Sequence, residues 1–166
     1  MQIRRLTSLD AEAYLRLRLA GLKNTPEAFG SSYSEEKDDP IEKYRQRFQS
    51  NDSLTLGAFN DSQLVGVVTL VKERLIKLRH RTTIVAMYVS PEQRGLRIGK
   101  SLMLEAIAAA NGIEGIEQVY LTVVTTNIPA KKLYSSLGFE VFGLEKRALK
   151  VDNTYFDEEH MVLFLK

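Results

Sequence analysis

Two short segments carry the residue types that are best suited to chemistry. In residues 84–103 an apolar, β-branched stretch leads through a Ser-Pro step into a turn with arginine and glycine, and then into a helical pattern. Backbone amides at a helix N-terminus bind anions, and Arg94, Arg97 and Lys100 add positive charge at this turn. The segment therefore predicts a site for the pyrophosphate of a nucleotide-like ligand.

The second segment, residues 127–139, follows another apolar stretch at residues 119–124. Asn127 has the side chain of a helix N-cap, Pro129 stands in the first turn, and Gly138 is suited to end the helix. The pattern predicts a short helix that directly follows a strand, as the first segment does.

At these positions the chain resembles the GNAT superfamily of N-acetyltransferases, which transfer an acetyl group from acetyl-CoA to an amine. The acetyl-CoA motif of that family, Arg/Gln-x-x-Gly-x-Gly/Ala, corresponds here to Arg94, Gly95, Leu96, Arg97, Ile98 and Gly99. Arg97 departs from the motif, because it stands where the family usually has its first glycine. The second motif, Asn-x-x-Ala-x-x-Leu-Tyr-x-x-x-Gly-Phe, is matched without gaps by Asn127, Ala130, Leu133, Tyr134, Gly138 and Phe139.

The resemblance implies a direct transfer from acetyl-CoA to a primary amine. It implies that the pantetheine arm lies between two splayed parallel strands and pairs with the backbone near Val89, where a main-chain N–H also stabilises the oxyanion. It further implies that Tyr134 is the general acid that protonates the departing sulfur. The residues expected to bind acetyl-CoA are Met87, Tyr88, Val89, Arg94, Gly95, Leu96, Arg97, Ile98, Gly99, Lys100, Ser101, Asn127, Ala130, Leu133 and Tyr134.

Some of these roles have alternatives. The alternative role of Tyr134 is only to pack its ring against the pantetheine, although a phenylalanine would do that equally well. Phe29 and Tyr33 flank the acceptor groove if the loop of residues 24–36 covers the sheet, as the matching loop does in the family. Otherwise these two aromatic residues pack in the core beneath that loop.

The acceptor amine and its base are less defined. No carboxylate lies in residues 82–89, so the general base is either a water chain or one of Glu35, Glu36 and Glu73. The acceptor is a small-molecule or peptide amine. A modest preference for cationic amines is suggested by the acidic side chains of Glu35, Glu36, Asp38 and Asp39.

Two other functions compete with this interpretation. Residues 95–101, GLRIGKS, end in Gly-Lys-Ser like a P-loop, but the P-loop spacing requires glycine at the position of Arg94. The next apolar stretch also ends in Val-Thr-Thr rather than in a magnesium-binding aspartate. A non-catalytic acyl-CoA sensor with the same fold is the second alternative, and Tyr134 argues against it.

Composition limits the remaining possibilities. The 166 residues, 44% of them hydrophobic, fit one domain over residues 1–166, and the absence of cysteine excludes disulfides and thiolate chemistry. His80 and His160 do not form a metal-binding pair, so no metal is expected. The net charge of +2 does not favour nucleic-acid binding, and no apolar run reaches the ~20 residues of a membrane span. We expect a cytoplasmic protein without membrane contact, either a monomer or a homodimer.

Strands and helices must position these sites. Apolar or alternating stretches predict six or seven strands, at residues 2–6, 53–59, 63–72, 82–89, 119–124, 139–149 and 154–165. Helical patterns begin near Thr7 or Ser8, near Pro40, and at residues 97–111 and 128–136, while residues 24–36 are the most loop-like. The predicted class is α/β (α+β), with a mixed, mostly antiparallel sheet, a splayed central parallel pair (82–89 and 119–124) and helices on both faces.

Overall fold

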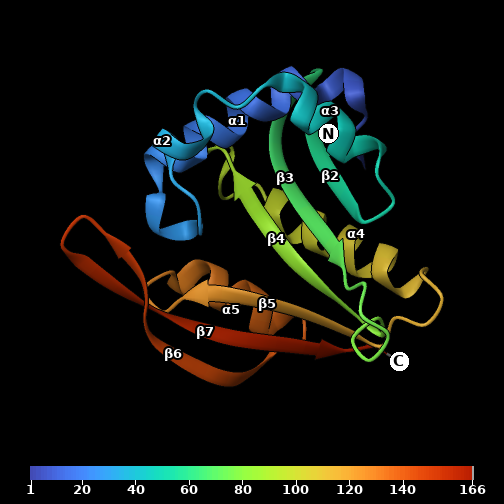
Figure 1. Ribbon diagram of the computed structural model, residues 1–166, viewed down its shortest axis with the longest axis vertical. Helices are drawn as coiled ribbons and strands as arrows, with labels where there is room; N and C mark the ends of the chain where they lie inside the picture. Colours follow the sequence, from blue (N-terminus) through green and yellow to red (C-terminus); the bar gives the residue numbers. More distant parts are fainter. Residues whose placement is uncertain (166) are drawn as a thin grey trace.

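A computed structural model describes residues 1–165, which form one seven-stranded sheet with helices on both faces (Figure 1). The strands are β1 (Gln2–Arg5), β2 (Ser53–Asn60), β3 (Gln63–Lys72), β4 (Arg81–Val89), β5 (Gln118–Val124), β6 (Glu140–Val151) and β7 (Thr154–Phe164). Their order across the sheet is β1-β2-β3-β4-β5-β7-β6, and only β4 and β5 run parallel. The predicted fold class is therefore confirmed.

The helices divide between the two faces of the sheet. They are α1 (Ala11–Asn24), α2 (Tyr33–Glu36), α3 (Ile41–Gln49), α4 (Ile98–Asn111) and α5 (Ile128–Ser136), with 3-10 turns η1 (Ser8–Asp10), η2 (Pro26–Ala28) and η3 (Pro91–Gln93). Buried side chains of α1 and α3 pack together on one face, and those of α4 and α5 pack on the other. Within the described part of the chain, no helix is long and apolar enough to cross a membrane.

The two parallel strands separate soon after they begin. Residues 81–83 of β4 pair with residues 118–120 of β5, and the parallel ladder then stops. Both strands nevertheless continue, β4 to Val89 and β5 to Val124. Beyond the third pair, the edge of β4 that faces β5 has no strand partner, so its backbone groups are free to bind something else.

A β-bulge at Ala86 changes which side chains of β4 face each side of the sheet. Ala86 has a left-handed backbone with φ of +54°, and the register between β3 and β4 shifts there. Ile84 before the bulge packs against the same core cluster as Met87 and Val89 after it, because the extra residue moves the alternation by one. Tyr88 consequently points to the opposite face and packs in the cluster formed with α1.

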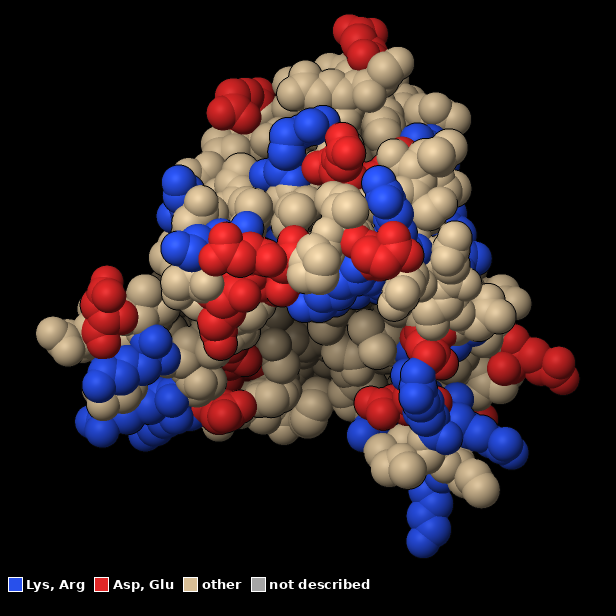
Figure 2. Space-filling model, turned by 45° about the horizontal axis from the view of Figure 1, so that its top comes forward, with Lys and Arg blue, Asp and Glu red and all other residues tan. Residues whose placement is uncertain are grey.

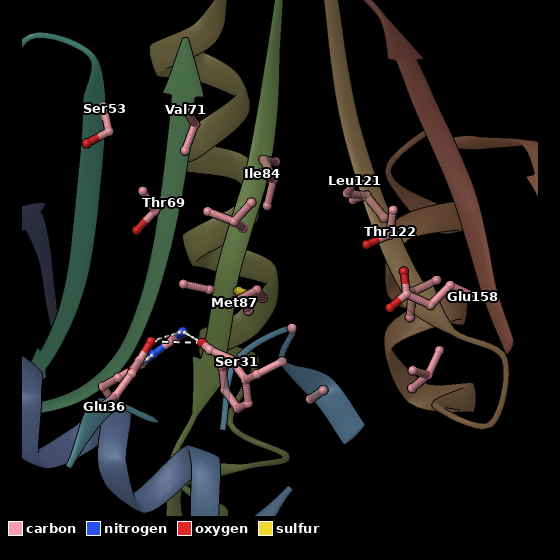
Figure 3. A pocket seen from close by; sticks show the side chains of 18 of the residues that line it. Ser31, Glu36, Ser53, Thr69, Val71, Ile84, Met87, Leu121, Thr122 and Glu158 are labelled. Carbon is pink, nitrogen blue, oxygen red and sulfur yellow. Dashed lines mark hydrogen bonds and ion pairs between the residues drawn. The ribbon is translucent and has the colours of Figure 1, made fainter. Parts of the chain in front are cut away.

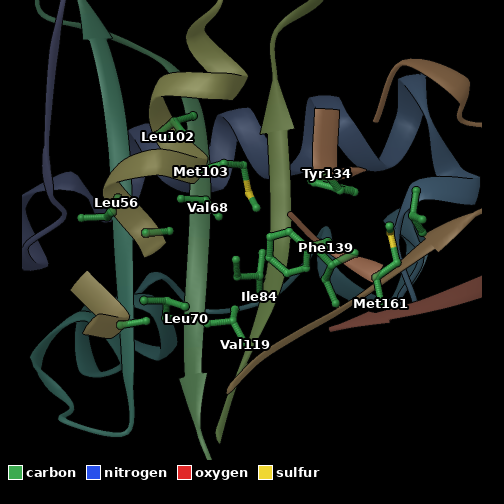
Figure 4. Packing of buried hydrophobic residues seen from close by; sticks show 14 of the residues in the cluster. Leu56, Val68, Leu70, Ile84, Leu102, Met103, Val119, Tyr134, Phe139 and Met161 are labelled. Carbon is green, nitrogen blue, oxygen red and sulfur yellow. The ribbon is translucent and has the colours of Figure 1, made fainter. Parts of the chain in front are cut away.

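The larger core lies between the sheet and helices α4 and α5 (Figure 4). Helix α4 presents one continuous apolar face, with buried residues three or four positions apart. Leu102, Met103, Ala106 and Ala110 are fully buried on this face, and Tyr134 and Phe139 complete the cluster near α5. This packing fixes the start of α4 against the end of β4.

The segment of residues 24–36 differs from the sequence prediction, which treated it as a loop. It contains the turn η2 and the short helix α2. The Ser32 hydroxyl accepts a hydrogen bond from the Glu35 amide at 3.3 Å, and the Ser32 amide donates to the Glu35 carboxylate at 2.8 Å. This reciprocal capping box stabilises the first turn of α2, which explains the local helix.

Candidate active site

A cavity of about 790 Å³ opens where β4 and β5 diverge. Met87, Asn127 and Tyr134 line it next to helix α5, whereas Arg18 and Phe29 line it next to helix α1. Figure 3 shows the β2–β4 half of the sheet on one side of this space and the β5–β7 half on the other. Because its walls come from both faces of the sheet, the cavity can bring together two ligands that enter from opposite sides.

The turn between β4 and α4 has the geometry of an anion site. Gly95 and Arg97 both have left-handed backbones, with φ of +80° and +62°. Helix α4 has no side-chain cap, so the amides of Ile98, Gly99 and Lys100 in its first turn are free for a ligand. The turn therefore presents free backbone amides of the kind that a pyrophosphate site requires.

The basic side chains at this turn fall into two groups. Arg94 Nε donates to the Val89 carbonyl at 3.1 Å, and its guanidinium lies 5.7 Å from the centre of the Tyr88 ring. Arg97 and Lys100 are exposed and form no ion pair within residues 1–165. Arg94 thus ties the turn to the end of β4, while the other two remain available to a phosphate.

The conformation of Arg97 explains the glycine that the family motif usually has at this position. A left-handed backbone costs an L-residue roughly 1–2 kcal/mol, whereas glycine adopts it freely. In this chain the turn keeps the same backbone shape with an arginine, so the turn gains a cation at some local cost in strain.

Gly99 lies where α4 approaches β4 most closely. A Cβ atom at this position would stand 3.1 Å from Cε of Met87, 3.7 Å from Leu133 and 3.9 Å from Val89. The first of these distances is shorter than ordinary van der Waals contact, and Met87 itself lines the cavity. A larger residue at Gly99 would therefore displace a side chain of the site.

Helix α5 begins as predicted from its sequence. The Asn127 Oδ1 atom accepts a hydrogen bond from the Ala130 amide at 3.3 Å, and Gly138 follows the helix with φ of +97°. Asn127 also lines the cavity, while Ala130 and Leu133 are half-buried against the larger core. The cap therefore places an amide side chain at the wall of the site.

Tyr134 has the environment of a group that holds its proton. Its side chain is 7% exposed, lines the cavity and makes no hydrogen bond within residues 1–165. Burial raises the pKa of its phenol to about 12, because ionisation would place a charge in an apolar surrounding. Near neutral pH the phenol is therefore protonated and can donate its proton.

Of the two aromatic residues predicted on the acceptor side, only one lines the cavity. Phe29 is buried, lines the cavity and lies 6.0 Å from the Tyr88 ring, centre to centre. Tyr33 does not line the cavity; its ring lies 4.6 Å from the Lys23 ammonium and packs against the α1 cluster. The structure thus brings Phe29 to the site and leaves Tyr33 outside it.

None of the three carboxylates considered as a base is free at the cavity. Glu36 reaches it, but Arg18 donates to both of its oxygens at 2.8 and 3.0 Å, and Ser31 donates at 2.8 Å. Burial acts to raise the pKa of Glu36, but these hydrogen bonds outweigh that effect and hold the pKa below its ordinary value. Glu35 and Glu73 do not line the cavity.

Three carboxylates that the sequence did not single out line the cavity; one of them, Asp52, pairs with Arg74, and the other two are Glu158 and Glu27. Glu158 on β7 stands opposite Val124 of β5, and Figure 3 shows it directed into the space. Glu27 lines the cavity from η2. Neither forms an ion pair within residues 1–165. The β5–β7 register that places Glu158 is a long-range pairing, for which the local sequence carries no signal.

Comparison with known proteins agrees with this geometry. Residues 22–139 match the profile of the acetyltransferase (GNAT) family. A spermidine N(1)-acetyltransferase from Thermoplasma acidophilum is 32% identical over 152 residues, which cover 85% of this chain and 89% of that protein. A mycothiol acetyltransferase from Brachybacterium faecium is 28% identical over 138 residues, covering 82% of this chain but only 39% of that protein.

Solved structures share the fold over nearly the whole chain. An acetyltransferase of the GNAT family from Streptococcus pneumoniae superposes with a TM-score of 0.89 at 21% identity, covering 99% of both chains. A putative acetyltransferase from Salmonella typhimurium, solved with its cofactor acetyl-CoA, superposes with a TM-score of 0.87 at 18% identity. That likeness covers 100% of this chain and 94% of the other.

We expect Gly99→Val to weaken binding of coenzyme A by about 10- to 100-fold, because over-packing of a tight contact costs about 1–3 kcal/mol. The displaced atom is Cε of Met87 at the cavity wall. Gly112→Val is the matched control, since Gly112 stands at the other end of α4 with only ordinary contacts at 3.5 Å or more. Calorimetry measures the dissociation constant of coenzyme A for both variants. Equal affinities for the two variants would contradict a cofactor site at Gly99.

Proposed function

We propose that this chain, which belongs to the acetyltransferase (GNAT) family and is an acetyl-CoA-dependent N-acetyltransferase, acetylates the primary amine of a small molecule. The main support for this proposal is the cavity of about 790 Å³ that joins both faces of the sheet at the point where β4 and β5 separate. Pockets for small molecules typically enclose about 300–1,000 Å³. A relative named for spermidine acetylation, 32% identical to this chain, supports a small amine.

The residues present fit acetyl-CoA. The free amides at the start of α4, with Arg97 and Lys100 beside them, suit the pyrophosphate. The unpaired edge of β4 suits the amide groups of the pantetheine arm, because that edge lacks a strand partner after residue 83. Acetyl-CoA supplies the acetyl group as a thioester. Asn127 at the cavity wall flanks the arm from α5.

Tyr134 is assigned as the proton donor. When the amine nitrogen bonds to the acetyl carbon and the carbon–sulfur bond breaks, the sulfur needs one proton. Tyr134 faces the cavity with a protonated phenol that has no other hydrogen-bond partner within residues 1–165. The buried surroundings that raise its pKa keep this phenol protonated, so it can donate a hydrogen bond to the sulfur as negative charge develops there.

Glu158 is assigned as the group that binds the acceptor ammonium and accepts its proton. The acceptor arrives mainly as an ammonium ion and must lose a proton before its nitrogen can attack. Glu158 lines the cavity and forms no ion pair within residues 1–165, which distinguishes it from Glu36 beside Arg18. Glu27 adds a second uncompensated carboxylate from η2. Glu158 therefore attracts the ammonium and accepts its proton directly or through one water.

The direct test measures release of free coenzyme A thiol from acetyl-CoA with a panel of small primary amines, peptides with free N-termini and no acceptor. We expect amine-dependent release with small amines and weaker release with peptides. Acetyl-CoA at 100 times its dissociation constant should also add about 2.7 kcal/mol of stability. Stabilisation without release for any amine would favour the acyl-CoA sensor, and faster release with peptides would overturn the proposed acceptor class.

We expect Tyr134→Phe to leave the affinity for acetyl-CoA nearly unchanged and to lower kcat by about 10²-fold, the lower range of general acid catalysis. Because the folded-state pKa of Tyr134 is raised to about 12, the proton-donating form is present through pH 10 and is lost as the pH rises toward 12. The wild-type kcat should show this alkaline loss and the variant should not. Tyr33→Phe is the control outside the cavity. An unchanged kcat in Tyr134→Phe would leave Tyr134 a packing residue.

We expect Glu158→Gln to lower kcat/KM for the amine by about 10²-fold while the dissociation constant of acetyl-CoA stays the same, since the change removes the proton acceptor without removing bulk. Glu159→Gln is the adjacent control, because Glu159 pairs with Lys131 at 3.0 Å and does not line the cavity. Steady-state assays of the three proteins decide the matter. Equal kcat/KM values for both variants would remove Glu158 from the mechanism.

A further inference from the structure

The helical wall of the cavity carries a cation without a counter-ion. Arg47 of α3 is half-buried, lines the cavity and forms no ion pair within the described residues. Its guanidinium lies 5.2 Å from the centre of the Tyr44 ring. Arg45, two positions earlier, is also half-buried but pairs with Glu42 at 3.7 Å. Of these two arginines of α3, the one that lines the cavity is therefore the one without an ion-pair partner within the described residues.

Two further residues on the same wall have hydrogen-bond donors without an acceptor in the described part of the chain. Arg18 donates through Nε and Nη2 to Glu36 and Ser31, but its Nη1 makes no hydrogen bond within residues 1–165. Tyr14 is 1% exposed and lines the cavity, and its hydroxyl also has no hydrogen-bond partner there. Donors without acceptors at a cavity wall suit a ligand that brings an acceptor.

The carboxylates on this wall are already engaged. Glu36 pairs with Arg18 at 2.8 Å, and Asp39 accepts from Lys43 and from the Tyr44 hydroxyl, both at 2.8 Å. Asp52, which also lines the cavity, pairs with Arg74. Each of these carboxylates thus has its own ion-pair partner. The hydrogen bond from Lys43 lowers the pKa of Asp39 most, and Arg47 also lowers it through its charge, but Arg47 forms no ion pair with any carboxylate within the described residues.

The cavity also has two carboxylates without an ion-pair partner in residues 1–165. Glu27 and Glu158 line it, and neither has a cationic partner within the described chain. In Figure 2 acidic and basic side chains both border the hollow beneath the helices. A ligand with positive charge at one end and negative charge at the other matches this arrangement better than a ligand with one sign of charge.

We infer that the acceptor is an amine that also carries an anionic group, a carboxylate or a phosphate, which Arg47, the free Nη1 of Arg18 and the Tyr14 hydroxyl bind at the helical wall. This inference rests on the proposed function, since it names the substrate class of the same cavity. A guanidinium binds either anion through charge-assisted hydrogen bonds. A diamine or longer polyamine would instead place its second ammonium against Arg47 and bind less well.

The test compares acceptors that share one amine and differ at the far end. For each chain length from two to six carbons, the ω-amino acid, the ω-aminoalkyl phosphate, the plain alkylamine and the diamine are assayed by release of coenzyme A thiol. We expect kcat/KM for at least one anionic acceptor to exceed that of its alkylamine by about 10- to 100-fold, as for a hydrogen bond to a charged group. The diamine should be the poorest of its set. The better of the carboxylate and phosphate series identifies the anion.

Substitutions of Arg47 test whether this residue causes the preference for anionic acceptors. Arg47→Gln should reduce the preference for the anionic acceptor to less than about threefold while the alkylamine rate stays within a factor of two, and Arg47→Lys should restore part of it. Arg45→Gln on the same helix should preserve it fully. Should Arg47→Gln fail to fold, the wild-type preference should still fall steeply with added salt, which weakens an ion pair and not an apolar contact.

The outcomes separate the two proposals. If no amine in any set is acetylated, the proposed small-molecule function fails. If alkylamines are acetylated but the anionic group gives no advantage, or if the diamines are preferred, the proposed function stands and the inferred anion site is overturned. A preference that Arg47→Gln and Arg45→Gln leave equally intact would also overturn it.

Discussion

The site depends on the parting of β4 and β5 after three paired residues. A parallel pair that ran its full length would satisfy the backbone of both strands and close the sheet. Because the pair stops early, the edge of β4 stays open and a cavity forms through the sheet. Helices α4 and α5 pack on one face of the sheet beside this opening, and α1, η2 and α3 border it on the other face.

Two local features adapt β4 to this opening. The bulge at Ala86 turns Met87 toward the α4 side and Tyr88 toward α1, so consecutive residues support opposite halves of the site. Gly99 lets α4 approach Met87 closely, and Arg94 donates back to the carbonyl of Val89. The anion turn and the cavity are thereby joined through the same few residues of one strand. The left-handed backbone of Ala86 is strained, and it persists because the packing around this residue fixes its conformation.

The sequence predicted the parts of the site that are encoded locally. The Asn127 cap, the turn before α4 and the apolar run that marks β4 each depend on residues close together in the chain. The acceptor wall was not predictable in this way. Arg18 meets Glu36 across 18 positions, and Glu158 faces the cavity only because β7 pairs with β5. Periodicity reports which face of an element is buried, and not which distant side chain will lie opposite it.

The clamp between Arg18 and Glu36 shows why a carboxylate at the right place is not by itself a base. Both oxygens of Glu36 accept hydrogen bonds from Arg18, and Ser31 adds a third, so protonating this carboxylate would break a buried network. Removing either partner would leave a charge at the cavity wall without compensation. The pair therefore holds the segment after α1 in place. Glu158, which also lines the cavity, has no ion-pair partner within residues 1–165 and is the better candidate for proton transfer under the proposed function.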